Sequence, residues 1–477
     1  MWNYIVTVAP NDYWLNLYRL ITLPARQHVD VPTAAAAVSQ LVTGHESLRT
    51  LIRPNIDELG GSLGDSTGYG QFVVDSGTLR IEIADATAGC AAQPDAPPRP
   101  VDNPEVQTGP IEPAVAQACE EMLRRLVPHP FAYADEWPVR AGLVVVSGLV
   151  RHILLVVSHV AADGYAMAIL GRDLRRLLAG RGPSRPDRLR PVDLAARERA
   201  DSRRTERAIA YWREAYERIP SEQLALAPLP PDGPTPARYH EVMLTSPAIL
   251  AAASRLARQR GVTTSAVLLT ATAVTLGSYT GSSTCGLITI VNNRHQAGND
   301  EVVAPISQLG LVVLEVPTRV PADPAGLADL LPATWQAALT AYRFAYYDPN
   351  QKDRALRESG RGGEVDVDPY CCFNDVRGNE VEATLSDVDP AGLLDRSTVQ
   401  RRDWEECSWR FLLAVRPAAD GICLSLTADT WCLSPDRIEA FLRGVERYVV
   451  AAAAREPAPT PAVAPRSDSQ PLGVSQL

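Results

Sequence analysis

The residues best suited to chemistry stand together in one short segment, Ser158-His159-Val160-Ala161-Ala162-Asp163-Gly164. A histidine has an ordinary pKa near 6.5, so His159 can accept a proton at neutral pH as a general base. Asp163 can hold the loop by pairing with an arginine, and Gly164 lets a ligand approach the backbone closely. We therefore take His159 and Gly164 as candidate catalytic residues, with backbone N–H groups near Gly164 able to stabilise an oxyanion.

Other interpretations of this segment are weaker. A lone histidine is often structural, and the pattern by itself is short. His159 and Asp163 lack a third ligand nearby, and the eight cysteines form no CxxC pair, so we expect no metal site. Adjacent strand residues point to opposite faces, and no G-x-S-x-G elbow is present, so His159 is not placed to activate Ser158 as a nucleophile.

Hydrophobic patterning predicts the elements that position the segment. Two β-rich runs, Ala141–Ser147 and His152–Ser158, form a hairpin that delivers His159 into a short loop. An amphipathic helix over Tyr165–Leu178 follows. Further strands are expected at Tyr18–Leu23, Leu79–Ile83, Glu241–Thr245, Gly286–Val291, Arg410–Val415 and Ile422–Ala428, and further helices at Thr33–Thr43, Pro113–Leu126, Arg204–Ile219, Pro247–Arg260, Val262–Leu276 and Pro435–Ala453.

This alternation indicates a mixed α/β protein with two halves of similar size. We expect an N-terminal lobe over residues 1–180, a connector over 181–209 and a C-terminal lobe over 210–455. Proline-rich composition marks a flexible insertion at Thr87–Pro113 and a flexible tail over 456–477.

Composition excludes several classes of protein. The formal net charge of −10 argues against a nucleic-acid partner. Lys352 is the sole lysine among 46 basic residues, so a P-loop or Schiff-base mechanism would have to use it. The apolar part of the longest uncharged stretch, Gly261–Asn293, is shorter than the roughly 20 residues that a membrane span needs. Isolated cysteines and the lack of a signal peptide favour a cytoplasmic protein.

With these elements in place, the chain resembles the condensation-domain superfamily of nonribosomal peptide synthetases, relatives of chloramphenicol acetyltransferase. The family signature HHxxxDG reads here as Ser158–Gly164. Other family blocks match in order at Gly44–Thr50 (GHESLRT), Pro130-Phe131, Trp137–Ala141 (WPVRA), Ala210–Arg213 (AYWR), Asn293-Arg294, Cys372–Asn374 and Thr427–Val445. The ordered set is far more specific than any single block.

Several positions depart from the family pattern. Ser158 replaces the first histidine of the signature, which the family uses structurally, whereas His159 keeps the place of the catalytic second histidine. Gly44 replaces the arginine that opens the RHExLRT block, and Ile306–Leu311 differs from the usual IGxFVN block. These departures indicate a specialised or partly degenerate member.

The resemblance implies two chloramphenicol-acetyltransferase-like α/β sandwich lobes in a V-shaped pseudo-dimer, with His159 midway along a central tunnel. Asp163 would be architectural, buried against Arg294 or Arg49, and Ser158 would be structural. We place three residues along the tunnel, although strand polarity and core packing are alternatives for the first and last: Asn374, Tyr165 and Trp409.

The resemblance also implies the activity. It predicts a monomeric acyltransferase of natural-product biosynthesis that joins a carrier-bound acyl or aminoacyl thioester to an amine or hydroxyl. No cofactor would be bound, because phosphopantetheine arms of peptidyl or acyl carrier proteins would present the substrates, and a small-molecule acceptor is a further option. Two alternatives stay open: a catalytically degenerate domain that recruits a carrier protein or tailoring enzyme, and epimerisation of a carrier-bound aminoacyl group.

Overall fold

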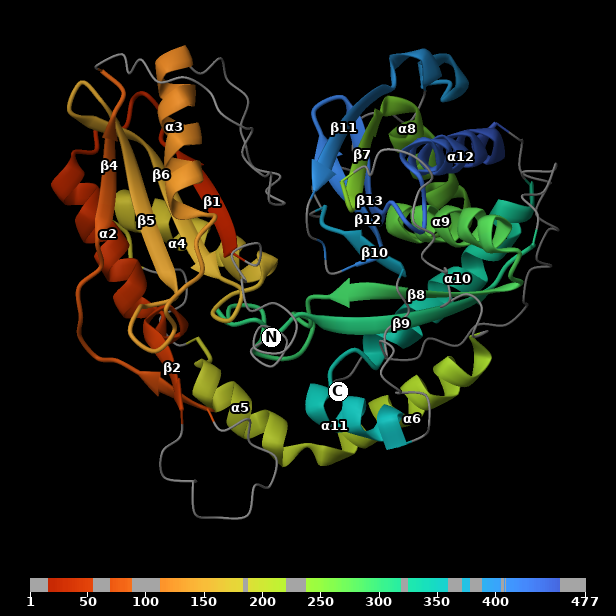
Figure 1. The fold of residues 1–477 in the computed structure, drawn as a ribbon, viewed down its shortest axis with the longest axis horizontal. Helices are drawn as coiled ribbons and strands as arrows, with labels where there is room; N and C mark the ends of the chain where they lie inside the picture. The colour runs from red at the N-terminus through yellow and green to blue at the C-terminus, as the bar shows by residue number, and fades with distance from the viewer. Residues whose placement is uncertain are drawn as a thin grey trace, which may run out of the picture.

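The computed structural model describes residues 16–54, 69–87, 112–182, 188–219, 237–318, 325–358, 371–377, 388–404, 407 and 409–454. These residues form two α/β lobes that lie side by side as the arms of a V and are joined at one end (Figure 1). The predicted fold class of two α/β sandwich lobes is confirmed. The tunnel stays a prediction, the proline-rich tail lies outside the described residues, and so does nearly all of the predicted insertion.

A four-stranded sheet forms the centre of the N-terminal lobe. Its strands lie in the order β1 (Asn16–Thr22), β6 (Leu149–Ser158), β5 (Val139–Val146) and β4 (Ile81–Asp85). Helices α2 (Val31–Gly44) and α4 (Gly164–Leu178) cover one face, and α3 (Pro113–Leu126) covers the other. Alternate residues of β6 point to opposite faces, so Leu155 packs with α2 and α4, whereas Val156 packs with α3. Burial on both faces explains why β6 is apolar almost throughout.

The turn between β5 and β6 is tighter than the sequence predicted. Ser147 and Gly148 both have positive φ angles, 51° and 78°, as a two-residue type I′ turn requires. Residues 149–151, expected in the turn, therefore belong to β6. The strand runs without interruption to Ser158, directly before His159.

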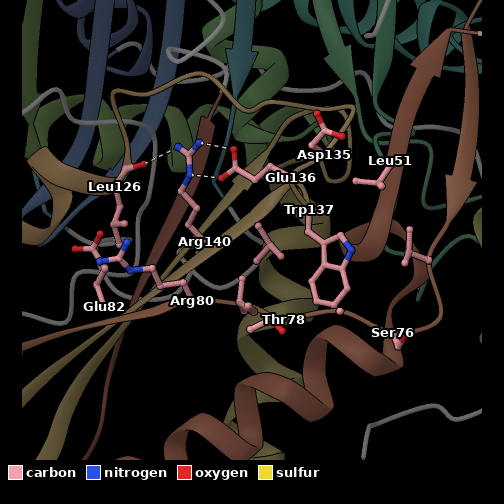
Figure 2. A pocket seen from close by; sticks show the side chains of 14 residues that line it. Leu51, Ser76, Thr78, Arg80, Glu82, Leu126, Asp135, Glu136, Trp137 and Arg140 are labelled. Carbon is pink, nitrogen blue, oxygen red and sulfur yellow. Dashed lines mark hydrogen bonds and ion pairs between the residues drawn. The ribbon is translucent and has the colours of Figure 1, made fainter.

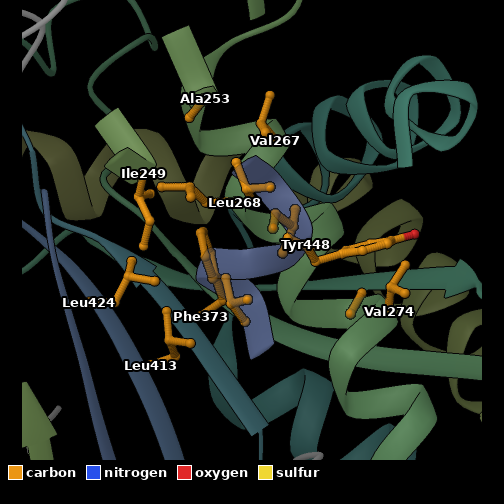
Figure 3. Packing of buried hydrophobic residues seen from close by; sticks show 14 of the residues in the cluster. Ile249, Ala253, Val267, Leu268, Val274, Phe373, Leu413, Leu424 and Tyr448 are labelled. Carbon is orange, nitrogen blue, oxygen red and sulfur yellow. The ribbon is translucent and has the colours of Figure 1, made fainter. Parts of the chain in front are cut away.

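A seven-stranded sheet forms the C-terminal lobe. Its strands lie in the order β11 (Thr398–Trp404), β7 (Tyr239–Ser246), β13 (Gly421–Asp429), β12 (Phe411–Ala418), β10 (Cys371–Asp375), β8 (Thr284–Val291) and β9 (Gln308–Glu315). Helices α8 (Pro247–Arg260), α9 (Thr264–Thr280), α10 (Ala325–Arg343) and α12 (Pro435–Ala453) enclose the large core on one face (Figure 3). Helices α6 (Ser202–Arg218) and α11 (Pro349–Leu356) cover the other face.

No single described helix is long and apolar enough to cross a membrane. Helices α8 and α9 meet that test only as a pair, and the chain bends by 107° between them. Helix α9 is apolar on all sides because it is buried in the core of the C-terminal lobe.

The two lobes meet through helix α5 (Pro191–Ala200) and the segment 292–307 between β8 and β9. Val303 belongs to the hydrophobic core of the N-terminal lobe, although it lies far into the second half of the sequence. Its neighbours Val302 and Ile306 pack against Leu194 of α5. A division into lobes by sequence position alone therefore misses a segment of the second half that completes the first lobe.

A buried polar cluster fixes the start of the connector on the N-terminal lobe. Arg188 donates to the Asp173 carboxylate of α4 at 2.7 Å, and the His45 Nε2 atom lies 3.3 Å from the same oxygen. Burial lowers the pKa of His45, so a neutral ring accepts a hydrogen bond from Arg188. The Gly44–Thr50 block thus supports the connector as well as the lobe around it. The 3₁₀ helix η2 (Glu46–Arg49) and the ribbon of β2 (Thr50–Pro54) and β3 (Tyr69–Val73) extend this region. In the other lobe, the 3₁₀ helix η5 (Ala391–Arg396) lies against α8 and β7.

Candidate active site

His159 lies in a tight turn between β6 and α4. The strand ends at Ser158, whose carbonyl accepts hydrogen bonds from the N–H groups of Ala161 (2.9 Å) and Ala162 (3.3 Å). The His159 side chain is half-buried, and its Nδ1 atom is buried without a hydrogen-bond partner among the described residues. Burial lowers the pKa of His159, and the nearby Asp163 carboxylate only partly opposes this shift. The imidazole is therefore neutral at pH 7 and able to accept a proton.

Asp163 begins helix α4 and joins the two lobes. Its side chain is 1% exposed. One carboxylate oxygen caps α4 by accepting from Ala166 N–H (2.8 Å) and also accepts from Arg294 (2.6 Å). The other oxygen accepts from Ile306 N–H (3.1 Å) and from the N–H (3.0 Å) and hydroxyl (2.9 Å) of Ser307. All five bonds go to groups of this chain, and the architectural role of Asp163 stays a prediction.

Arg294 organises the segment that approaches Asp163. Its guanidinium donates to the carbonyls of Asn299 (3.1 Å), Val302 (2.6 Å) and Ala304 (3.3 Å), and it lies 5.0 Å from the centre of the Tyr165 ring. A planar group with five N–H donors suits such a task better than an ammonium group. Arg294 therefore holds residues 299–304 together and binds the Asp163 carboxylate with the same guanidinium group.

The prediction that Arg49 is an alternative partner of Asp163 is wrong. Arg49 donates to the Val74 carbonyl at 2.9 Å and lies 3.6 Å from the Asp75 carboxylate. The physical reason is its position at the end of η2, next to the β2–β3 ribbon, where it binds the chain that leaves β3. Arg49 supports the N-terminal lobe and does not reach the His159 turn.

Gly164 occupies the first position of α4 and is exposed. A Cβ atom at this position would meet no atom within 4 Å, so packing does not account for the glycine. The first N–H groups of a helix have no partner within the helix, and here Asp163 takes that of Ala166. The role of Gly164 N–H as an oxyanion donor stays a prediction.

Ser158 is a buried structural residue with a partner that the sequence did not reveal. Its hydroxyl lies 2.8 Å from the Tyr133 hydroxyl and accepts a longer bond from Val160 N–H, at 3.4 Å. Tyr133 follows the Pro130-Phe131 block closely, which is the signal that could have suggested it. No pattern in the sequence shows that this loop returns to the end of β6.

The three predicted tunnel residues lie in different surroundings. Tyr165 is 43% exposed in the first turn of α4, under the Arg294 guanidinium. Asn374 is partly exposed on β10, opposite Ala414 of β12. Trp409 packs against the cluster around Trp212, as the core-packing alternative expected. Contact of these side chains with a substrate stays a prediction.

A separate hollow of about 470 Å³ lies in the N-terminal lobe (Figure 2). Trp137, Arg140 and Leu51 are among the residues that line it, and none of them belongs to the turn at 158–164. It is therefore distinct from the site around His159.

Lysine and metal chemistry find no support in the described residues. Lys352 is buried in α11, with its Nζ atom 4.3 Å from the centre of the Trp212 ring and 3.1 Å from Asp353. Within the described part of the chain, no three His, Cys, Asp or Glu side chains lie close enough together to hold a metal ion.

Comparison with known proteins identifies the class. The family model of the condensation domain matches residues 107–461, so the chain belongs to the condensation domain family. It is 26% identical over 284 residues to chondramide synthase of Chondromyces crocatus, covering 57% of this chain and 6% of that protein. It is 28% identical over 338 residues to isonitrile lipopeptide synthase of Mycobacterium tuberculosis, covering 68% of this chain and 12% of that protein. The chain thus spans only a small part of these relatives.

Solved structures agree in fold. The condensation domain that mediates chain release from the enacyloxin polyketide synthase has a TM-score of 0.66 at 18% identity, covering 94% of this chain and 80% of that one. The X-domain from teicoplanin biosynthesis has a TM-score of 0.62 at 20% identity, covering 92% and 90%.

We call the bonds from Asp163 to Arg294, Ile306 and Ser307 the Asp163 brace. This brace makes a quantitative prediction about stability. Asp163→Asn leaves Arg294 as a buried cation without its carboxylate, so we expect the free energy of unfolding to fall by about 3–5 kcal/mol. Urea denaturation followed by circular dichroism measures this loss.

The matched control is Asp403→Asn, because the Asp403 carboxylate is exposed and pairs with His240 at the surface. Its loss should cost less than about 1 kcal/mol. Equal stability of Asp163→Asn and Asp403→Asn would contradict the brace.

Proposed function

We propose that this protein is an acyltransferase that joins a thioester-bound acyl or aminoacyl group to an amine or hydroxyl. The observation that carries the proposal is a half-buried His159, whose pKa is lowered by burial, in a turn fixed at both ends within a condensation-domain fold. A general base needs an unprotonated ring and a fixed direction, and both follow from these contacts.

The reaction that this geometry supports is a displacement at the thioester carbonyl. The nitrogen or oxygen of the acceptor attacks the carbonyl carbon while His159 takes the acceptor's proton. A new C–N or C–O bond forms, the C–S bond breaks, and the proton passes from His159 to the leaving thiolate. Backbone N–H groups in the first turn of α4, including that of Gly164, would face the carbonyl oxygen as it gains charge.

We further propose that phosphopantetheine arms of carrier proteins present the donor and, in one form of the reaction, the acceptor. The support is family membership together with synthase relatives much longer than this chain. A free amine or alcohol as acceptor is the second form. We propose that a monomer suffices, because the proposed chemistry uses residues of this chain alone. The cytoplasm stays the proposed location, on the isolated cysteines of the sequence.

The departures from the family pattern do not by themselves favour a non-catalytic, recruiting domain. Ser158 bonds to Tyr133, and Ser307 in the altered 306–311 block bonds to Asp163, so these two altered positions make contacts at the site. Epimerisation would use the same base, His159, on a Cα–H group. It differs from transfer in its product, which keeps the thioester and inverts one stereocentre.

Replacing the base should nearly abolish transfer. For His159→Ala we expect a loss of about 10²–10⁴-fold in kcat/KM, the usual contribution of a general base. The assay follows transfer from a panel of acyl and aminoacyl N-acetylcysteamine thioesters to amine and alcohol acceptors by chiral chromatography and mass spectrometry.

His295→Ala is the matched control, because His295 is exposed in the segment between β8 and β9 and should leave the rate unchanged. A folded His159→Ala protein with the wild-type rate would refute the role of His159. Inversion of the donor without transfer would replace the proposal by epimerisation. A wild-type protein that yields neither product but binds a carrier protein tightly would support recruitment.

The pH profile should reflect the buried imidazole. The pKa of His159 lies below its ordinary value of 6.5, so the active, unprotonated form prevails at pH 7. We therefore expect the acid limb of the kcat/KM profile to be centred below pH 6.5, the ordinary value for a histidine. The rate profile from pH 5 to 8 tests this, and an acid limb centred above 6.5 would show that His159 is not the titrating base.

A further inference from the structure

The end of β6 carries a hydrogen bond that the reaction does not use. Ser158 is wholly buried, and its hydroxyl meets the Tyr133 hydroxyl at 2.8 Å. The same Ser158 oxygen accepts from Val160 N–H, so the contact reaches both neighbours of His159 in the chain. A buried hydroxyl group requires a partner, and the partly buried Tyr133 supplies one to Ser158.

Ser158 also controls the backbone of the His159 turn. Its N–H donates to the Pro138 carbonyl at 3.0 Å, and its carbonyl accepts from the N–H groups of Ala161 and Ala162. The direction of the imidazole therefore depends on where Ser158 lies. A group that fixes the position of the Ser158 side chain therefore also fixes the backbone of the His159 turn.

Arg140 on β5 fixes the loop that presents Tyr133. Its guanidinium donates to the carbonyls of Leu126 (3.2 Å), His129 (2.8 Å) and Pro130 (2.9 Å). It also pairs with Glu136, whose contact is drawn with that of Leu126 in Figure 2. One side chain thus ties together both ends of the segment that contains Tyr133.

Asn16 fixes the same loop from the other side of β6. It lies on β1 directly opposite Ser158, and its amide donates to the carbonyls of Val127 (2.9 Å) and His129 (2.8 Å). The Tyr133 carbonyl in turn accepts from Ile52 N–H at 2.9 Å. Tyr133 is therefore held independently of Ser158, and its hydroxyl is a fixed point to which the strand end is attached.

We infer that Tyr133 is a positioning residue for His159: its hydroxyl bonds to Ser158 and thereby fixes the turn that aims the imidazole. This inference rests on the proposed acyl transfer for its kinetic consequence. Tyr133 touches neither substrate nor base in this scheme. Its effect is geometric, and errors of about 1 Å in the placement of a catalytic group can cost on the order of 100-fold in rate.

Removing the hydrogen bond between Tyr133 and Ser158 from either side should slow the proposed transfer step. For Tyr133→Phe and for Ser158→Ala we expect kcat to fall about 10-fold with KM little changed, since the displacement of the turn is a fraction of 1 Å. Both proteins lose the same bond, so the double variant should be no slower than the slower single variant. The measurement uses the donor and acceptor pair that the wild type transfers fastest.

Tyr279→Phe is the matched control, because it removes a tyrosine hydroxyl that bonds to the Arg437 carbonyl in the other lobe. It should leave kcat and KM unchanged. Additive losses in the double variant, or an unchanged kcat in both single variants, would overturn the inference. Ser158→Ala keeps the inference testable if Tyr133→Phe does not fold.

A readout without substrate separates this inference from the proposed function. In protein with isotope-labelled histidine, the His159 ring signal is assigned by its loss in His159→Ala and titrated by NMR. A looser turn admits water, so Tyr133→Phe should raise the pKa of His159 towards 6.5. An unchanged titration would overturn the positioning role. A shifted titration in a protein without transferase activity would uphold it while the proposed function fails.

Discussion

The buried carboxylate of Asp163 is the contact on which the arrangement of the site depends. It caps α4, pairs with Arg294 and accepts from the backbone ahead of β9. A charge removed from water is costly unless it is paired and hydrogen-bonded, so separating any of these groups leaves an uncompensated ion. The N-terminal lobe therefore cannot keep its helix start while the segment from the C-terminal lobe moves away. Val303, which fills the N-terminal core from that same segment, adds hydrophobic burial to the electrostatic link.

The turn of His159 is consequently held from two directions. Asp163 fixes its far end through the second lobe, and Ser158 fixes its near end through Tyr133 within the first lobe. Between these points the imidazole is half-buried, and burial keeps it neutral at the pH where a base is needed. The same packing thus gives the ring both its direction and its protonation state. In the proposed transfer, this small set of bonds would therefore fix the base without any contact to the substrate.

The strong preference for arginine acquires a structural meaning at several of these points. Arg294 and Arg140 each bind three backbone carbonyls and one carboxylate, which a planar guanidinium can do and a lysine ammonium cannot do in the same geometry. Each of these two guanidinium groups holds together a loop that has no regular secondary structure. The single lysine, Lys352, lies instead against the Trp212 ring, where a compact cation suits an aromatic face.

The sequence by itself determined the two α/β lobes, the apolar strand that ends before His159 and the helix that follows, because these depend on local periodicity and on ordered family blocks. It could not decide between Arg294 and Arg49 as the partner of Asp163, nor find Tyr133 beside Ser158. It also assigned residues 149–151 to a loop, since a type I′ turn depends on backbone angles rather than on apolar pattern. The Asp163–Arg294 pair joins residues 131 positions apart. Only the tertiary structure decides such contacts, because they bring together residues from both lobes that no local pattern relates.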